Sequence, residues 1–379
     1  MIYFDNAATS FPKPPSVTQA VVEYMTEYGA NPGRSGHKLS VRAGETVFRT
    51  RKKLAEFFGV KNPMRVIFGS NATDSLNLAI KGVLKQGDHV ITSSMEHNST
   101  IRPLKKMEEN GIISLTILKG DEKGKISVHE IDDAILKNTA VVVVNHMSNV
   151  SGTVQPINEI GERCRFKGIM LIVDCAQSAG IIPIDMNRDN IDIIAFAGHK
   201  GLYGPTGTGG MVISDSFEFS RIKSLKEGGT GSLSDREYQP DFLPDKFESG
   251  TLNVAGIAGL GAGIDFINIY NDGITGIIKH KKELQDYFLT SAKNINGIKF
   301  YYSDEGPGVV SFTIDGMSVS EITTELSEKY CIMSRQGLHC APLAHKRIGT
   351  FPEGTVRFGF SIFNTKEQID KTVKALKEM

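Results

Sequence analysis

The chain has 379 residues, of which 40% are hydrophobic and 23% charged, and its 43 basic and 43 acidic side chains cancel. This length predicts two domains. The composition is ordinary for a globular protein and excludes a disordered chain. The balanced charge excludes a global field that recruits nucleic acid or an anionic membrane. The first residues lack a signal-peptide pattern, and no apolar segment approaches the roughly 20 residues that span a bilayer, so we expect a cytoplasmic protein.

Strands and helices alternate through the first two hundred residues. Three predicted strands each precede a predicted helix, and the pairs cover residues 65–84, 88–111 and 113–138. Four further strands are too uniformly apolar to have a wet face, and they cover residues 140–147, 169–176, 191–198 and 207–214. This alternation predicts an α/β fold built of βαβ units on a mainly parallel central sheet.

The rest of the chain has a different pattern. Residues 227–253 are rich in Gly, Ser, Asp and Pro and predict a long ordered loop. The segments after it predict helices at 254–273, 276–295 and 365–379 and strands at 309–314 and 355–362. We therefore expect a large domain of residues 15–258 and a smaller α+β domain of residues 1–14 and 259–379.

Polar residues follow the buried strands, where ligands bind in open α/β sheets. They are Asn149, Asp174, Gln177, His199 and Lys200. A lysine at the end of an apolar strand is typical of a Schiff-base lysine, because a desolvated amine is more readily neutral and nucleophilic. A phosphate-binding P-loop does not fit, because the required spacing fails around Lys200.

Pyridoxal phosphate is the cofactor that matches such a lysine. Asp174 offers the acid that keeps a pyridine nitrogen protonated, and Gln177 lies where it can bond the ring hydroxyl. The strand, polar turn and helix start at Ala72 and Thr73 suit the cofactor phosphate, although a plain helix cap has the same pattern. His97 is placed to stack on a cofactor ring, although a structural role is the better explanation of this histidine taken alone.

The four cysteines are widely spaced and form no CxxC pair, which is typical of a reducing compartment. We expect Cys164, Cys175 and Cys331 to be small buried apolar side chains. Cys340 lies in "SRQGLHCAPLAHKRIG", residues 334–349, and is a metal ligand, a core residue or a nucleophile. A zinc site formed with His339 and His345 is disfavoured, because adjacent residues rarely bind one ion.

A series of motifs carries a resemblance over nearly the whole chain. They are "YFDNAAT", "GSNATDSLN", "MEHNST", "HMSNVSG", "VDCAQSAG", "GHKGLYGPTG", "ESGTLN", "RQGLHCAPLAH" and "TVRFGFSIFNT". In this order they resemble the cysteine desulfurase and selenocysteine lyase family of class V, fold type I pyridoxal-phosphate enzymes. The resemblance implies a place in sulfur metabolism, including iron–sulfur cluster assembly.

The resemblance implies a role for each matching residue. Lys200 matches the Schiff-base lysine, Asp174 the pyridinium partner, Gln177 the ligand of the ring oxygen and His97 the stacking imidazole. Ala72, Thr73 and His199 match phosphate-binding positions. Asn149 and Arg357 match substrate contacts, with Arg357 as the clamp on the amino-acid carboxylate and Arg335 assisting. Thr251 matches a residue that is donated to the neighbouring subunit's phosphate site, which implies a homodimer with shared active sites.

Cys340 matches the family's catalytic cysteine. The implied reaction converts L-cysteine to L-alanine and leaves the sulfur on Cys340 as a persulfide, which a sulfur-acceptor protein then takes. Three alternatives stay open at this stage: a selenocysteine lyase, a class V aminotransferase or β-lyase with Cys340 incidental, and a scaffold without cofactor. His339 is either a proton donor or a structural imidazole.

Two positions depart from the family pattern. Ala197 stands where members usually carry Ser or Thr as a further phosphate ligand. Losing one hydrogen bond to a charged group weakens binding by roughly 1.5–3 kcal/mol unless another group replaces it. Gly201 lies between the lysine and "LYGP", where many members have no extra residue, so the path of this loop is open.

Overall fold

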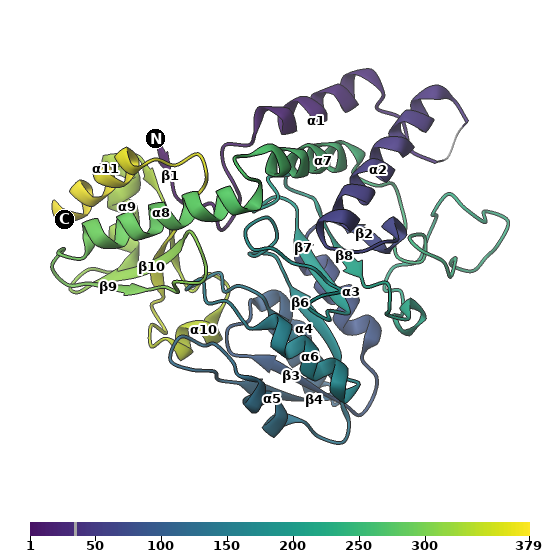
Figure 1. Cartoon of the computed structure of the whole chain (residues 1–379), viewed down its shortest axis with the longest axis horizontal. Coiled ribbons are helices and arrows are strands. Elements are labelled where there is room, and N and C mark those ends of the chain that lie inside the picture. The colour runs from purple at the N-terminus through teal and green to yellow at the C-terminus, as the bar shows by residue number, and fades with distance from the viewer. Residues whose placement is uncertain (34–35) are drawn as a thin grey trace.

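The computed structural model describes residues 1–33 and 36–379. Its centre is a seven-stranded sheet with the order β2-β8-β7-β6-β5-β3-β4 (Figure 1). The strands are β2 (Val66–Gly69), β3 (Asp88–Ser93), β4 (Ile113–Leu118), β5 (Thr139–Asn145), β6 (Met170–Asp174), β7 (Ile193–Ala197) and β8 (Gly209–Ile213). β8 is antiparallel to both neighbours and the pairs from β7 to β4 are parallel, which confirms the mainly parallel sheet.

Successive strand residues point to opposite sides of this sheet, so both faces carry apolar side chains. Helices cover both faces. Val142 and Val144 of β5 belong to a core with Leu54 and Ile160. Val141 and Val143 belong to a second core with helices α3 and α4. The α-helices up to residue 269 are α1 (Pro15–Glu27), α2 (Lys38–Phe57), α3 (Ala72–Val83), α4 (Asn98–Glu109), α5 (Val128–Ala134), α6 (Ile157–Lys167) and α7 (Val254–Ile269).

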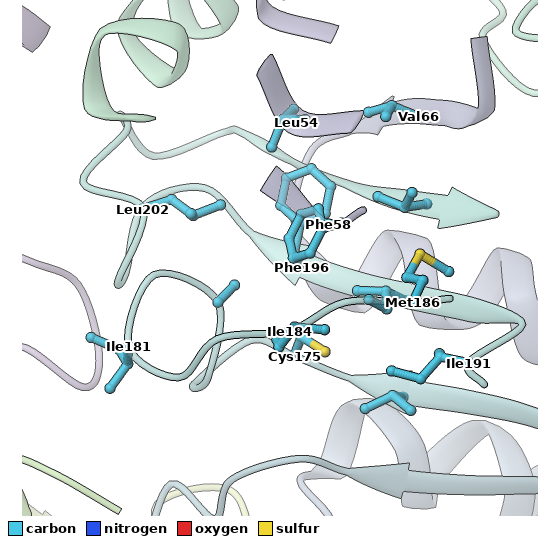
Figure 2. Close-up of a cluster of buried hydrophobic side chains, with 14 of the residues drawn as sticks. Leu54, Phe58, Val66, Cys175, Ile181, Ile184, Met186, Ile191, Phe196 and Leu202 are labelled. Atoms are coloured by element: carbon cyan, nitrogen blue, oxygen red, sulfur yellow. The ribbon is translucent and has the colours of Figure 1, made fainter. Parts of the chain in front are cut away.

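The first of these cores is shown in Figure 2. Phe196 of β7 packs against Phe58, which follows α2, with ring centroids 5.5 Å apart, and Leu54 lies beside them. Cys175 lies in the same cluster directly after β6. This apolar layer fixes the ends of β6 and β7, where Asp174 and Lys200 follow.

A four-stranded antiparallel sheet forms the smaller part, in the order β12-β13-β10-β9. Its elements are α8 (Ile274–Ala292), β9 (Ile298–Tyr301), β10 (Val309–Ile314), α9 (Val319–Tyr330), β11 (Ile332–Met333), β12 (Arg335–Gly337), α10 (Pro342–Arg347), β13 (Thr355–Gly359) and α11 (Lys366–Lys377). The N-terminal strand β1 (Ile2–Tyr3) pairs with β11, so the first residues lie beside the last hundred (Figure 1).

One expectation from the sequence is wrong, and others are confirmed. Cys164 and Cys175 are buried as expected, but Cys331 is exposed, because it ends α9 in a left-handed conformation at the surface. The predicted loop at 227–253 is confirmed and extends away from the sheet (Figure 1). The division into domains stays a prediction, and α7 runs unbroken across its boundary at residue 258. No helix in the described parts of the chain is long and apolar enough to cross a bilayer.

One buried ion pair ties the long loop to the sheet. Arg51 of α2 binds both carboxylate oxygens of Glu248 at 2.8 and 2.7 Å, and the backbone N–H of Phe68 donates to the same carboxylate at 2.6 Å. Breaking a buried pair leaves an uncompensated charge. We expect Arg51→Met to lower the free energy of unfolding by about 3–5 kcal/mol in urea titrations.

The exposed pair of Arg42 with Glu23, at 2.6 Å, is the control for this measurement. Arg42→Met should change the free energy of unfolding by about 1 kcal/mol or less, because solvent screens the pair. Equal effects of the two substitutions would contradict a special role for the Arg51–Glu248 pair.

Candidate active site

A pocket of about 500 Å³ lies at the carboxyl ends of β5, β6 and β7. Eight of the predicted site residues line it, as does Ala197: Ala72, Thr73, His97, Asn149, Asp174, Gln177, His199 and Lys200. These residues come from separate segments of the chain. They meet because the sheet brings the strand ends and the starts of α3 and α4 to one edge.

Lys200 and Asp174 supply the amine and the carboxylate of this pocket. Burial lowers the pKa of Lys200 to about 8, and the carboxylate of Asp174 partly opposes that shift. Burial also raises the pKa of Asp174, although the backbone N–H of Ala176 donates to its Oδ1 at 2.8 Å. The lysine is therefore neutral far more often than a solvated one, as a nucleophilic amine requires.

His97 and Thr73 are joined by a third side chain. The Ser99 hydroxyl lies 2.8 Å from Thr73 Oγ1 and 2.6 Å from His97 Nδ1. His97 caps α4, since its Nδ1 accepts the backbone N–H of Ser99 at 3.1 Å. Burial, reinforced by nearby cations, lowers the pKa of His97 to about 4, so the imidazole is neutral at pH 7. Two helix N-termini and two hydroxyls thus meet at one end of the pocket.

Buried polar atoms without protein partners also face this pocket. Among the described residues, Asn149 Oδ1, Asn145 Oδ1 and His199 Nδ1 have no hydrogen-bond partner. All three residues line the pocket. Because unpaired buried polar atoms are rare in folded proteins, these atoms indicate a site for a polar ligand. Gln177 has a partner, since its Nε2 donates to the carbonyl of Ala7 at 2.9 Å.

Arg357 lies beside the pocket and is almost completely buried. Its Nη1 donates to the carbonyl of Asn149 and its Nη2 to the carboxylate of Asp5, both at 3.0 Å. Its Nε finds no partner among the described residues. Burial lowers the pKa of Arg357 to about 10, while Asp5 opposes the shift. The guanidinium therefore stays charged and keeps one donor free for a carboxylate.

Cys340 approaches the site from the smaller sheet. Its Sγ lies 3.7 Å from Arg335 Nη2, and its carbonyl accepts the backbone N–H of Asn98 at 2.7 Å. Asn149 Nδ2 donates to the carbonyl of the preceding residue, His339, at 2.7 Å. The cysteine is exposed, and its charge acts on the pKa of Lys200. Tertiary contacts thus hold Cys340 and its neighbour His339 next to the residues of the pocket.

Thr251 lies elsewhere. It lines a larger pocket, of about 1060 Å³, with Leu225, Phe247 and Asn253. The smaller pocket contains Lys200, Asp174 and the unpartnered polar atoms, so it is the candidate active site, although the other pocket is larger.

Comparison with known proteins identifies the family of this chain. The sequence model described as aminotransferase class V matches residues 2–372. The chain belongs to the class V aminotransferase family. Members of this family are pyridoxal-phosphate enzymes.

A named class V relative and two solved structures match this chain over nearly its whole length. A probable cysteine desulfurase of Methanothermobacter thermautotrophicus is 35% identical over 382 residues, which span 100% of this chain and 94% of the relative. The apo cysteine desulfurase of Thermococcus onnurineus has a TM-score of 0.92 and 32% identity, and the match covers 100% of this chain and 94% of that one. Escherichia coli CsdA, also a cysteine desulfurase, has a TM-score of 0.89 and 25% identity, over 99% and 94%.

Sequence reasoning missed several residues of this class V site. Asn145 ends β5 as Asp174 ends β6, so the strand-end rule applied to β5 would have found it. Ser99 follows His97 by two residues, where a helix start places its hydroxyl beside the cap. The contact of Asp5 with Arg357 joins residues 352 positions apart and leaves no local signal.

His339 and His345 lie next to each other and are engaged in hydrogen bonds through both ring nitrogens. His339 Nδ1 and His345 Nε2 lie 3.3 Å apart, and each ring uses its other nitrogen for a further hydrogen bond. Within residues 1–33 and 36–379, no three His, Cys, Asp or Glu side chains gather as metal ligands do.

Proposed function

We propose that this chain is a pyridoxal-phosphate-dependent cysteine desulfurase that converts L-cysteine to L-alanine and takes up the sulfur on Cys340 as a persulfide. The observation that carries the proposal is the convergence of Lys200 and Asp174 in one pocket with Cys340 held at its edge by Asn98. The cysteine desulfurase names of the relatives and structural neighbours support it.

The residues present fit pyridoxal phosphate. Asp174 would hold the pyridine nitrogen, Lys200 would bind the carbonyl carbon, and His97 would lie over the ring. The N-terminus of α3 at Ala72 and Thr73, with the unpaired Nδ1 of His199, would hold the phosphate. Ser99 supplies a hydroxyl near the end where Ala197 lacks one. When bound, the cofactor withdraws electrons from the substrate Cα.

The chain's own side chains account for the remaining chemistry. Arg357 binds the substrate carboxylate through its free Nε–H, and Arg335 adds a second positive charge. Lys200 Nζ takes the proton from the substrate Cα. The thiolate of Cys340 attacks the substrate sulfur, so an S–S bond forms as the C–S bond breaks. The electron pair of that bond stays on Cβ, which takes up the proton that the Cys340 thiol gave up. Lys200 Nζ returns its proton to Cα, which yields alanine and the Cys340 persulfide.

The products of L-cysteine turnover test this proposal. We expect alanine in equal amount to sulfur released by a reductant such as dithiothreitol. Pyruvate with free sulfide would instead identify a β-lyase and would overturn the desulfurase assignment. Selenocysteine, offered in parallel with cysteine, separates the desulfurase from a selenocysteine lyase, since a lyase would turn over only the selenium substrate.

The pKa of Lys200 has a direct consequence for cofactor uptake. A neutral amine is needed to react with the cofactor carbonyl, and burial lowers the lysine pKa to about 8. Uptake by the apoprotein should therefore accelerate as pH rises through about 8 and level off above it. Stopped-flow absorbance after mixing with pyridoxal phosphate across a range of pH on both sides of this value measures it. A midpoint near the ordinary lysine value of about 10.4 would contradict it.

A homodimer with shared active sites is part of the proposal. Thr251 lies outside the pocket that contains Lys200 of its own chain, at the end of the long loop 227–253, which supports its donation to a neighbouring subunit's phosphate. Thr251→Val should weaken the binding of pyridoxal phosphate without altering the residues around Lys200. Light scattering of the wild type should give twice the chain mass, and a monomer that binds cofactor normally would refute the shared site.

A protein acceptor completes the proposed cycle. Because Cys340 is exposed, its persulfide is accessible to a second thiol. Alanine formation with and without candidate acceptor proteins identifies the one that accelerates turnover. The cytoplasmic location expected from the sequence stays a prediction.

A further inference from the structure

The backbone around Cys340 adopts a conformation that side chains disfavour. His339 and Cys340 have φ values of 48° and 56°, two consecutive left-handed residues that are not glycine. Such residues persist only where their surroundings hold them, and they concentrate at functional sites. The carbonyls of both residues are held by Asn149 and Asn98 of the large domain. The smaller domain must hold the loop from the other side.

A row of hydrogen bonds lies on that other side. His339 Nε2 lies 3.3 Å from the carbonyl of Arg335, and His339 Nδ1 lies 3.3 Å from His345 Nε2. His345 Nδ1 lies 2.7 Å from Thr350 Oγ1. Exposure of His339 is 3%, of His345 0% and of Thr350 7%, so water does not compete for these atoms.

The chemistry of the partners fixes the direction of every bond. A backbone carbonyl only accepts, so His339 Nε2 carries a hydrogen and its Nδ1 is the acceptor. His345 Nε2 must then donate to His339, and its own Nδ1 accepts from the Thr350 hydroxyl. Burial lowers the pKa of His339 to about 2 and that of His345 to about 4, so both rings are neutral. In this arrangement each ring nitrogen has one partner.

The two ends of this row, Arg335 and Thr350, lie before and after Cys340 in the chain. Arg335 is fixed in β12, opposite Arg357 of β13, and its guanidinium contacts Cys340 Sγ. Thr350 follows α10, and its backbone N–H donates to the carbonyl of His345 at 2.9 Å. The row therefore spans the strand before Cys340 and the helix after it.

We propose that Thr350, His345 and His339 form a neutral hydrogen-bonded chain that positions Cys340 for sulfur uptake, with His339 a positioning residue and not a proton donor. A proton donor needs a hydrogen directed at the substrate, but both nitrogens of His339 are engaged away from it. The chain keeps the Cys340 thiol beside Arg335, where a cation stabilises the negative charge of the reactive sulfur. This inference rests on the proposed role of Cys340.

Thr350→Val and Thr350→Ser form a matched pair for the test. Valine has the shape of threonine but donates no hydrogen, whereas serine keeps the donor. The holoenzyme of each variant is treated with iodoacetamide, and mass spectrometry gives the alkylation rate of Cys340 relative to Cys331. Cys331 is a fair internal reference because it is also exposed and left-handed but lies outside the chain of hydrogen bonds.

We expect Thr350→Val to lower the Cys340-to-Cys331 ratio about fivefold, the factor that one hydrogen bond supplies, and Thr350→Ser to stay near wild type. His345→Gln should retain most of the ratio, because an amide also offers one acceptor and one donor. With cysteine as substrate, kcat should fall in Thr350→Val while KM is unchanged.

An unchanged or higher ratio in Thr350→Val, or a loss that serine does not restore, would overturn the positioning role. The alkylation ratio needs no turnover, so it decides this point even if the desulfurase assignment fails.

Discussion

Replacing Lys200 with alanine is expected to lower alanine formation from L-cysteine by about 10²- to 10⁴-fold, the range for the loss of a positioned acid–base group. The variant loses the amine that binds the cofactor carbonyl and moves the Cα proton. Its bound cofactor should also lack the long-wavelength absorbance of a lysine adduct. An alanine assay and an absorbance spectrum of the purified variant measure the two effects.

Lys281 provides the control for this substitution. It too is buried, and burial lowers its pKa to about 8, but it lies on α8 and is not among the residues that line the pocket. Lys281→Met keeps the length of the side chain and should leave both the spectrum and turnover near wild type. If Lys281→Met abolished the absorbance and Lys200→Ala did not, the assignment of the cofactor lysine would be wrong.

Replacing Cys340 with alanine should reduce cysteine turnover to background while cofactor binding is retained. The sulfur then has no nucleophile to receive it, whereas Lys200, Asp174 and Arg357 stay in place. Alanine production and the cofactor spectrum, measured on the same sample, separate chemistry from folding. The Cys340 peptide of wild-type protein, analysed by mass spectrometry after turnover without a reductant, should carry one additional sulfur atom.

Cys331→Ala is the matched control, since Cys331 is an exposed thiol at the end of α9. It should turn over cysteine as the wild type does. Unchanged cysteine turnover in Cys340→Ala would rule out the persulfide scheme. Selenocysteine serves as a further arm, because its weaker carbon–selenium bond makes the nucleophile less necessary, so partial activity on selenocysteine alone would accord with the scheme.

Local sequence was sufficient to predict the elements that carry most of the pocket. Each of Asp174, His199 and Lys200 directly ends or closely follows a uniformly apolar strand, and such strands can lie only in the middle of a covered sheet. The order of the parallel strands then brings these ends to one edge. The long helices α1 and α2 were not predicted from the sequence. The expectation that Cys331 is buried was wrong, because the exposure of this residue depends on how α9 ends.

The sequence by itself determined the α/β class, the strand-end residues and, through ordered motifs, the likeness to the cysteine desulfurases. These features follow from residue type and local spacing. The tertiary structure alone decided that Asp5 pairs with Arg357, that Asn98 and Asn149 hold the Cys340 loop, and that His339 and His345 bond to each other. Most of these contacts join segments more than a hundred residues apart. Their geometry depends on how the two sheets pack, and no local pattern in the chain encodes it.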